Sequence, residues 1–238
     1  MRVGLLSVLL VLLAVPVSAQ DVIVQPVEPA LPVLATKDIV VWADWIAGTV
    51  TPGRVSGLLA GTPITVTSAS ILPSQDGSSG QPVYWKNTAT YVSAHVPNAP
   101  TTADIIKISA AQLYTITFAT PVVDPLIAIV SLGGLVAVTW DFGTTPIVLR
   151  SQGPGYFGAG PLSVAGNILT GHEGHGVIQA TGTFTALSFM MTTFENWVGF
   201  TVGVPQTIVL PPRGTFLNAM LEWEYTDADS ATYAGRLP

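Results

Sequence analysis

The stretch GHEGHG at residues 171–176 holds two of the three histidines in the chain, so it is the first place to look for chemistry. Two imidazoles and a carboxylate are a common ligand set for catalytic zinc, which makes His172, Glu173 and His175 candidate metal ligands. A zinc-protease helix, however, needs its histidines four residues apart, whereas these are three apart and lie among glycines. The glycines favour a hairpin turn that leads into the strand-like VIQATG. We expect the turn and keep a metal-dependent hydrolase as the alternative.

Acidic residues in loops provide a second kind of candidate site. Asp76 in SQDGSSG and Asp141 in WDFGTT are of the type that joins backbone carbonyls around calcium. Such an Asp is more commonly a turn former, because its side chain hydrogen-bonds the backbone two residues on. Calcium also needs about six oxygens, and no spaced cluster of acids provides them. We therefore expect no cofactor, with calcium as the alternative.

A nucleophilic catalytic site is not indicated. His95 precedes a proline turn and has no partner nearby in the sequence. None of the serines lies in the G-x-S-x-G elbow that marks the nucleophile of many hydrolases. The sequence therefore predicts no catalytic residues and favours a protein that is not an enzyme.

Aromatic residues give the strongest indication of a binding surface. The faces of sugar rings stack on aromatic side chains, while their hydroxyls bind planar amides and carboxylates. We predict that Glu173 and four aromatic residues contact a carbohydrate ligand, the four being Tyr84, Trp85, Tyr156 and Phe157. In contrast, we expect Trp140 and Trp197 to belong to the hydrophobic core, as most aromatic residues of β-sandwiches do.

The rest of the sequence predicts strands. Short apolar runs rich in β-branched residues are separated by Gly, Pro, Asn or Asp, and no strongly periodic helix lies among them. The runs lie at 40–48, 63–71, 82–92, 104–108, 113–119, 125–133, 135–142, 146–151, 176–182, 183–191 and 197–204. The fold class that this predicts is all-β, a single antiparallel β-sandwich with a jelly-roll-like topology. LGGL at 132–135 predicts a tight hairpin turn between two of the strands.

The ends of the chain predict export. Residues 1–19 combine Arg2, an apolar run and a small-residue cleavage site, as a secretory signal peptide does. Residues 20–38 form a proline-rich extended leader, residues 39–204 the β-sandwich, and residues 205–238 a tail that is either a short helix at 215–221 or disordered. We therefore expect a secreted bacterial protein with no transmembrane segment after the signal is removed.

The charge of the chain restricts its possible binding partners, and its cysteine content restricts how the fold is stabilised. Removal of Arg2 with the signal leaves 7 basic against 14 acidic residues, a net charge of 7 − 14 = −7. Such a chain repels phosphate backbones, so nucleic-acid binding is excluded from the expected functions. The chain has no cysteine and hence no disulfide, so a hydrophobic core must hold it together.

Several stretches resemble the extracellular domain of bacterial PEP-CTERM sorting-domain proteins, which are exported and processed by exosortase. They are WADW at 42–45, NAPTTADII at 98–106, ITFATPVVDPLIAIVSLG at 116–133, SQGPGYFGAG at 151–160, GNILTGHEGHGVIQATGTFTALSF at 166–189 and ENWVGFTVGV at 195–204. The resemblance implies a secreted β-sandwich tied to the cell envelope or the exopolysaccharide matrix, and it brings no catalytic residues. The family's C-terminal anchor is missing, because the chain continues from Val204 into PQTIVLPPRG and an acidic tail. Either a frameshift near Gln206 or a released variant of the family would end in this way.

The function that these observations predict is that of a non-catalytic protein of the cell surface or extracellular matrix, binding polysaccharide or other surface proteins. One alternative is a structural subunit, an oligomer in which residues 21–35 add as a strand to the sheet of a neighbouring copy. The other alternative is the metal-dependent hydrolase at His172, Glu173 and His175.

Overall fold

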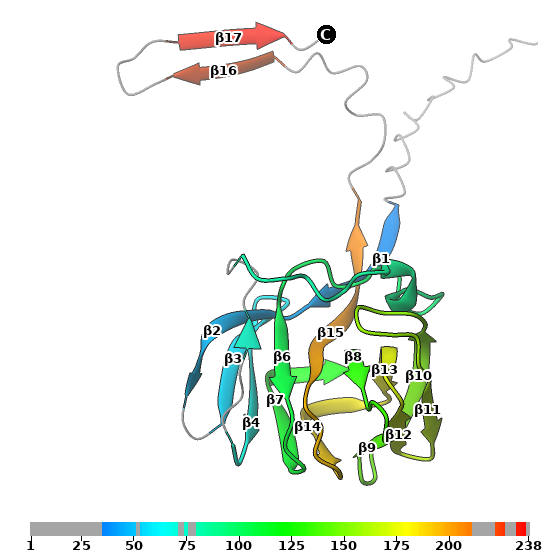
Figure 1. Cartoon of the computed structure of the whole chain (residues 1–238). Helices are drawn as coiled ribbons and strands as arrows, with labels where there is room; N and C mark the ends of the chain where they lie inside the picture. Colours follow the sequence, from blue (N-terminus) through cyan, green and yellow to red (C-terminus); the bar gives the residue numbers. More distant parts are fainter. Residues whose placement is uncertain are drawn as a thin grey trace, which may run out of the picture. The chain divides into compact units, whose positions relative to one another are not determined.

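The computed structural model describes residues 35–50, 53–70, 74–75, 80–210, 222–226 and 232–236. Two antiparallel sheets pack face to face (Figure 1), which confirms the expected β-sandwich. The first sheet consists of β1 (Thr36–Trp42), β5 (Ser74–Gln75), β6 (Ile105–Ile108), β8 (Leu126–Leu132), β10 (Ile147–Gln152), β13 (Gly174–Ala180) and β15 (Val198–Val209). The second consists of β2 (Asp44–Val50), β3 (Arg54–Leu59), β4 (Thr62–Ser68), β7 (Leu113–Val123), β9 (Val138–Asp141), β11 (Leu162–Ala165), β12 (Ile168–Gly171) and β14 (Thr183–Met191).

Along the sequence, the chain passes repeatedly from one sheet to the other. The first sheet runs β10-β13-β8-β15-β6-β5, with β1 also paired to β15, and the second runs β11-β12-β9-β14-β7-β4-β3-β2. From β6 to β10, consecutive strands alternate between the two sheets, so the loops between them cross the sandwich at its ends.

No helix in the described part of the chain has the length and apolar character needed to cross a membrane.

The main core lies between the sheets and follows the alternation of the sequence. On β7, Tyr114, Ile116 and Phe118 are buried while Leu113 and Thr117 face solvent. This is the period of two that a strand with one covered face requires. The deepest part of this core is aromatic, and the rings of Trp140 and Phe189 stack with their centroids 4.4 Å apart.

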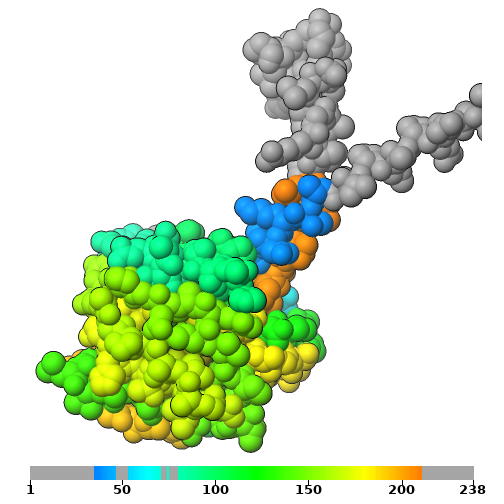
Figure 2. Space-filling model, turned by 90° about the vertical axis from the view of Figure 1, so that its right-hand side faces the viewer, coloured from blue at the N-terminus to red at the C-terminus, as the bar shows by residue number. Residues whose placement is uncertain are grey.

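The centre of the first sheet is covered on both faces, which explains the nearly uninterrupted apolar run of β8. Every residue of β8 and of β13 is buried. Ile127 and Ile129 of β8 face the main core, whereas Leu126 and Ala128 belong to a second apolar cluster. That cluster is closed by residues 80–104, hereafter the covering segment, which runs across the outer face of the sheet (Figures 1 and 2).

The covering segment corrects one expected strand. Residues 82–92 are not a strand but an irregular stretch that ends in the short 3-10 helix η1 (Thr88–Tyr91). Asn87 has a left-handed backbone with φ of 60°, which breaks the extended course. Conversely, the expected strands left out β3, β11 and β12, where glycine or polar residues interrupt the apolar pattern.

Two glycine-rich stretches connect different sheets and are not hairpin turns. LGGL at 132–135 joins β8 of the first sheet to β9 of the second. GHEGHG likewise joins β12 of the second sheet to β13 of the first, through His172 and Glu173. Both hairpin predictions were wrong, because the strands on either side of each stretch belong to different sheets and do not pair with each other.

The first sheet extends beyond the expected limits of the β-sandwich domain, residues 39–204. β1 begins at Thr36 and pairs along its length with β15, which continues to Val209. In the expected tail, β16 (Glu222–Thr226) and β17 (Thr232–Arg236) pair antiparallel, so these residues are neither helical nor without regular structure. The expected signal peptide, residues 20–34 of the leader and the candidate helix at 215–221 lie outside the described residues.

The side chain of Asn98 fastens the covering segment to β1. Its Oδ1 accepts a hydrogen bond from the backbone N–H of Val40 (2.7 Å), and its Nδ2 donates to the carbonyl of Val40 (2.9 Å). Trp42 also donates from Nε1 to the carbonyl of Asn98 (3.1 Å). The amide thus occupies the place of a neighbouring strand at this point of the sheet edge.

Replacement of Asn98 by Ala leaves both backbone groups of the buried Val40 without these partners. We expect Asn98→Ala to lower the free energy of unfolding by about 2–3 kcal/mol, since each lost bond to a buried group costs about 1–1.5 kcal/mol. Urea denaturation measures this loss, and the exposed Asn196→Ala is the matched control. Equal stability of the two variants would contradict this role for Asn98.

Candidate functional site

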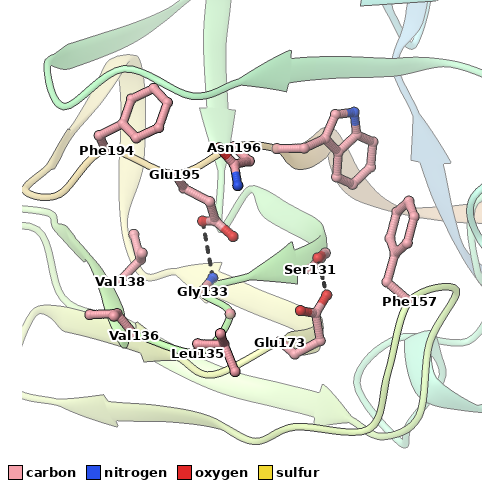
Figure 3. Close-up of a pocket in the computed structure, with 12 residues that line it drawn as sticks. Ser131, Gly133, Leu135, Val136, Val138, Phe157, Glu173, Phe194, Glu195 and Asn196 are labelled. Atoms are coloured by element: carbon pink, nitrogen blue, oxygen red, sulfur yellow. Dashed lines mark hydrogen bonds between the residues drawn. The ribbon is translucent and has the colours of Figure 1, made fainter.

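A cleft with a volume of about 530 Å³ opens where several sheet-crossing loops meet (Figure 3). Ser131 near the end of β8 and Gly133 in the loop after it line the cleft. Glu173 comes from the link between β12 and β13, and Glu195 from the loop between β14 and β15. Phe157, from the loop between β10 and β11, stands at one side. The cleft is therefore built from stretches that are far apart in the sequence.

Glu173 is held by its backbone and its side chain. Its N–H donates to the carbonyl of Gly133 (3.1 Å), and its Oε1 accepts a short hydrogen bond from the Ser131 hydroxyl. Glu173 has a φ of 59° and Ser131 a φ of 62°, a left-handed conformation that non-glycine residues rarely adopt. Ser131 lies at an irregularity in the pairing of β8 with β13, where β8 holds one extra residue. Strain of this kind costs about 1–3 kcal/mol per residue and is found mainly at functional sites.

Glu195 faces the same cleft and is partly buried. Its Oε2 accepts a hydrogen bond from the N–H of Gly133 (3.0 Å). Burial raises the pKa of Glu195 to about 7; the Gly133 hydrogen bond opposes this shift, and the charge of Glu173 adds to it. Gly133 therefore connects the two residues, because its N–H donates to the carboxylate of Glu195 and its carbonyl accepts from the backbone N–H of Glu173.

Four aromatic rings form a continuous cluster next to the carboxylates: Tyr84, Tyr156, Phe157 and Trp197. The centroid distances within it range from 4.8 Å (Tyr156 to Phe157) to 5.9 Å (Tyr84 to Phe157). Phe157 and Trp197 line the cleft, while Tyr84 and Tyr156 continue the cluster away from it. Phe157 is 50% exposed, an unusual state for so large an apolar ring.

Three of the four aromatic residues predicted to contact a ligand lie together in this cluster, and the fourth does not. Trp85 is only 2% exposed and packs edge-on against Tyr91 in the second apolar cluster, so its prediction as a ligand contact was wrong. Trp197 was expected in the core, but it is partly exposed and lines the cleft. The tripeptide Glu195-Asn196-Trp197 could have signalled this, since it puts a carboxylate, an amide and an indole side by side. Trp140 is fully buried, as expected.

The residues predicted as metal ligands do not form a metal site. His172 is exposed, whereas His175 is completely buried. Nδ1 of His175 accepts a hydrogen bond from the N–H of Ser131 (3.2 Å), and burial lowers the pKa of its ring to about 4. Within the described ranges, no three His, Asp or Glu side chains lie close enough together to hold a metal ion. The prediction of a metal site at His172, Glu173 and His175 was therefore wrong.

The remaining candidates have simpler roles. Asp141 accepts a hydrogen bond at Oδ1 from the N–H of Gly143 (2.8 Å), which is the turn-forming contact that the sequence favoured over calcium. His95 is exposed at the surface. Asp76 lies outside the described residues.

A glycine-rich loop, residues 153–160, covers the GHEGHG stretch. A Cβ at Gly155 would lie 2.2 Å from the His175 ring, and one at Gly158 would lie 2.6 Å from Cγ of Glu173. The carbonyl of Pro154 accepts hydrogen bonds from the side chains of Thr90 (2.6 Å) and Asn87 (3.2 Å), which fasten the loop to the covering segment. The loop thus holds Phe157 beside Glu173.

Comparisons of the chain with family models, with curated proteins and with solved structures gave no match. The chemistry of the cleft is therefore the basis for assigning a function.

The contact between Gly155 and His175 tests how the loop is held. A methyl group at Gly155 would force the buried ring or the loop to shift, so we expect Gly155→Ala to destabilise the fold by about 1–3 kcal/mol. Gly134→Ala is the control, because the nearest atom to its Cβ would be Glu173 Oε2 at 3.8 Å. Thermal unfolding of both variants measures the difference. A Gly155→Ala variant as stable as Gly134→Ala would show that the loop does not depend on this approach.

The raised pKa of Glu195 predicts a pH-dependent stability. The folded protein keeps this proton up to about pH 7, while the unfolded chain releases it near the ordinary value of 4.5. Stability contributed by this group is therefore present below about pH 4.5 and is lost as the pH rises through 7. We expect Glu195→Gln to abolish this loss and to be more stable than wild type at pH 8 by about 1–2 kcal/mol, a figure reduced for partial exposure. Urea denaturation from pH 4 to 8 measures it, and parallel profiles for the two proteins would refute the assignment.

Proposed function

We propose that this chain is an exported protein of the cell surface or extracellular matrix and that it binds polysaccharide in the cleft. One observation carries the proposal: the rings of Phe157 and Trp197 line the same cleft as the carboxylates of Glu173 and Glu195. Aromatic rings provide apolar faces on which a sugar ring stacks. The carboxylates accept hydrogen bonds from its hydroxyls, and the neighbouring Asn196 can both donate and accept.

The dimensions and the construction of the cleft suit this role. Ligand sites in proteins commonly have volumes of about 300–1,000 Å³ and combine aromatic walls with a few placed polar groups. Here the volume is about 530 Å³, and Gly133 and Ser131 fix both carboxylates before any ligand arrives. Such fixed groups lose little conformational entropy on binding, which favours affinity.

Features of the sequence support a location outside the cell. Residues 1–19 have the pattern of a secretory signal peptide. Residues 40–204 resemble the extracellular domain of PEP-CTERM sorting-domain proteins, which implies contact with the envelope or the exopolysaccharide matrix. Charged residues make up only 9% of the chain, and a surface rich in Thr, Ser and Gly is common in exported β proteins. The structural-subunit alternative depends on residues 21–35, which lie outside the described part except for Ala35.

Removal of the aromatic wall tests the proposal. We expect Phe157→Ala and Trp197→Ala each to weaken polysaccharide binding about tenfold, since a stacked aromatic contact contributes roughly 1–1.5 kcal/mol. Affinity electrophoresis and calorimetry with a panel of bacterial and plant polysaccharides measure this. Leu113→Ala is the matched control, because Leu113 is 49% exposed on β7 and does not line the cleft.

Two results would contradict a binding role for the cleft. Affinities unchanged in both aromatic variants would place the ligand elsewhere. The appearance of new reducing ends in the same mixtures would mean that the protein hydrolyses the polymer. The second result would replace a binding protein with an enzyme.

A further inference from the structure

The two carboxylates of the cleft have no cation beside them. No Lys, Arg or His is among the described residues that line it. The electrostatic influences on Glu195 are its burial, the Gly133 N–H and the negative charge of Glu173, and no basic side chain contributes. Two carboxylates directed into one partly buried space repel each other unless a proton or a cation lies between them.

Each carboxylate keeps one oxygen free for a ligand. Glu173 uses Oε1 to accept from Ser131, and Glu195 uses Oε2 to accept from Gly133. Among the described residues, none donates to the second oxygen of either group. Figure 3 shows both carboxyl groups directed into the same opening. The arrangement therefore offers two fixed acceptors to a donor that carries several hydrogens.

The aromatic cluster already binds ammonium groups of the protein itself. Nζ of Lys86 lies 4.8 Å from the centre of the Tyr156 ring, and Nζ of Lys107 lies 5.9 Å from that of Tyr84. Both distances are within the range of a cation–π contact. Neither lysine lines the cleft, so Phe157 and Trp197 keep ring faces available for a cation from outside.

We propose that the ligand of the cleft is a glycan with free amino groups, a partly deacetylated polymer of 2-amino sugars, and that its ammonium group binds between Glu173 and Glu195 beside Phe157 and Trp197. This inference rests on the proposed function. The sugar rings stack on the aromatic wall, and the ammonium, with three N–H donors, provides the positive charge that the cleft lacks. Acidic glycans are repelled, and acetylated ones lose the charged contact.

Calorimetry with two matched oligosaccharides tests the inference. One is a hexamer of β-1,4-linked glucosamine and the other is its fully N-acetylated counterpart, both measured against the wild-type chain at about pH 6, below the pKa of the sugar amine. We expect the amino hexamer to bind roughly tenfold more tightly, the size of effect that a charge-assisted hydrogen bond gives. In Glu173→Gln/Glu195→Gln this preference should disappear, because neither side chain then carries the charge that attracts the ammonium.

A control variant separates the cleft from the general charge of the protein. Asp44→Asn removes an exposed carboxylate on β2 that does not line the cleft, so the preference for the amino hexamer should persist in it. Thermal unfolding of each variant confirms that it is folded. A preference reduced equally in Asp44→Asn would mean non-specific attraction and would overturn the inference.

The failure of the inference and that of the proposed function give different results. If polysaccharides bind but wild type does not distinguish the two hexamers, the amino-sugar inference is wrong and polysaccharide binding stands. If no glycan of either kind binds, the proposed function itself is wrong. If spermidine binds as tightly as the amino hexamer, the cleft recognises charge alone and the glycan part of the inference is wrong.

Discussion

The contact of the glycine-rich loop, residues 153–160, with the GHEGHG stretch is the constraint on which the rest of the site depends. Because Gly155 has no side chain, the backbone of the loop lies directly on the buried ring of His175. The link between the two sheets is thereby closed from outside, with His175 pointing inward and His172 outward. Glu173, between them, is left at the cleft, and Phe157 is held beside it. The GHEGHG stretch, which resembles a metal-binding motif, thus has a packing role: it positions the carboxylate of Glu173 and the ring of Phe157.

The same contact explains why strained backbone conformations occur at Ser131 and Glu173. The extra residue in β8 turns Ser131 out of the regular pairing, so that its hydroxyl donates to Glu173 while its N–H donates to His175. Both Ser131 and Glu173 keep a left-handed backbone, which a fold selected for stability alone would avoid. Buried neighbours on both faces of β8 stabilise the sheet enough to hold this conformation. The strain fixes the carboxylate of Glu173, and a fixed carboxylate is more useful to a binding site than to the core.

The sequence predicts the strands well where the determinant is local. The alternation of LYTITFA and the run TFTALSFMM correspond to β7 and β14, because burial of one face imposes a period of two. Pairing partners are not local, and for this reason LGGL and GHEGHG were expected to be hairpins although they cross between sheets. For the site, an aromatic pair inside a loop was a sound signal, since Tyr156 and Phe157 join Tyr84 in one cluster. Trp85 was expected at the ligand but is buried, and Trp197 was expected in the core but lines the cleft. Burial in this region depends on the irregular covering segment, whose course cannot be predicted from a periodic pattern in the sequence.

The charge content of the chain bears on what the cleft holds. In a protein with few charged residues, two carboxylates meet in one partly buried space and no basic side chain lines it. In the free protein near neutral pH, the repulsion is relieved in part by the proton that Glu195 retains because its pKa is raised to about 7. An ammonium group beside Glu195 would favour the ionised form of this carboxyl, so its binding would release that proton. A proton and a cation therefore compete for Glu195. The cleft gains its second negative charge when a ligand supplies the opposite charge, which favours cationic sugars over neutral ones.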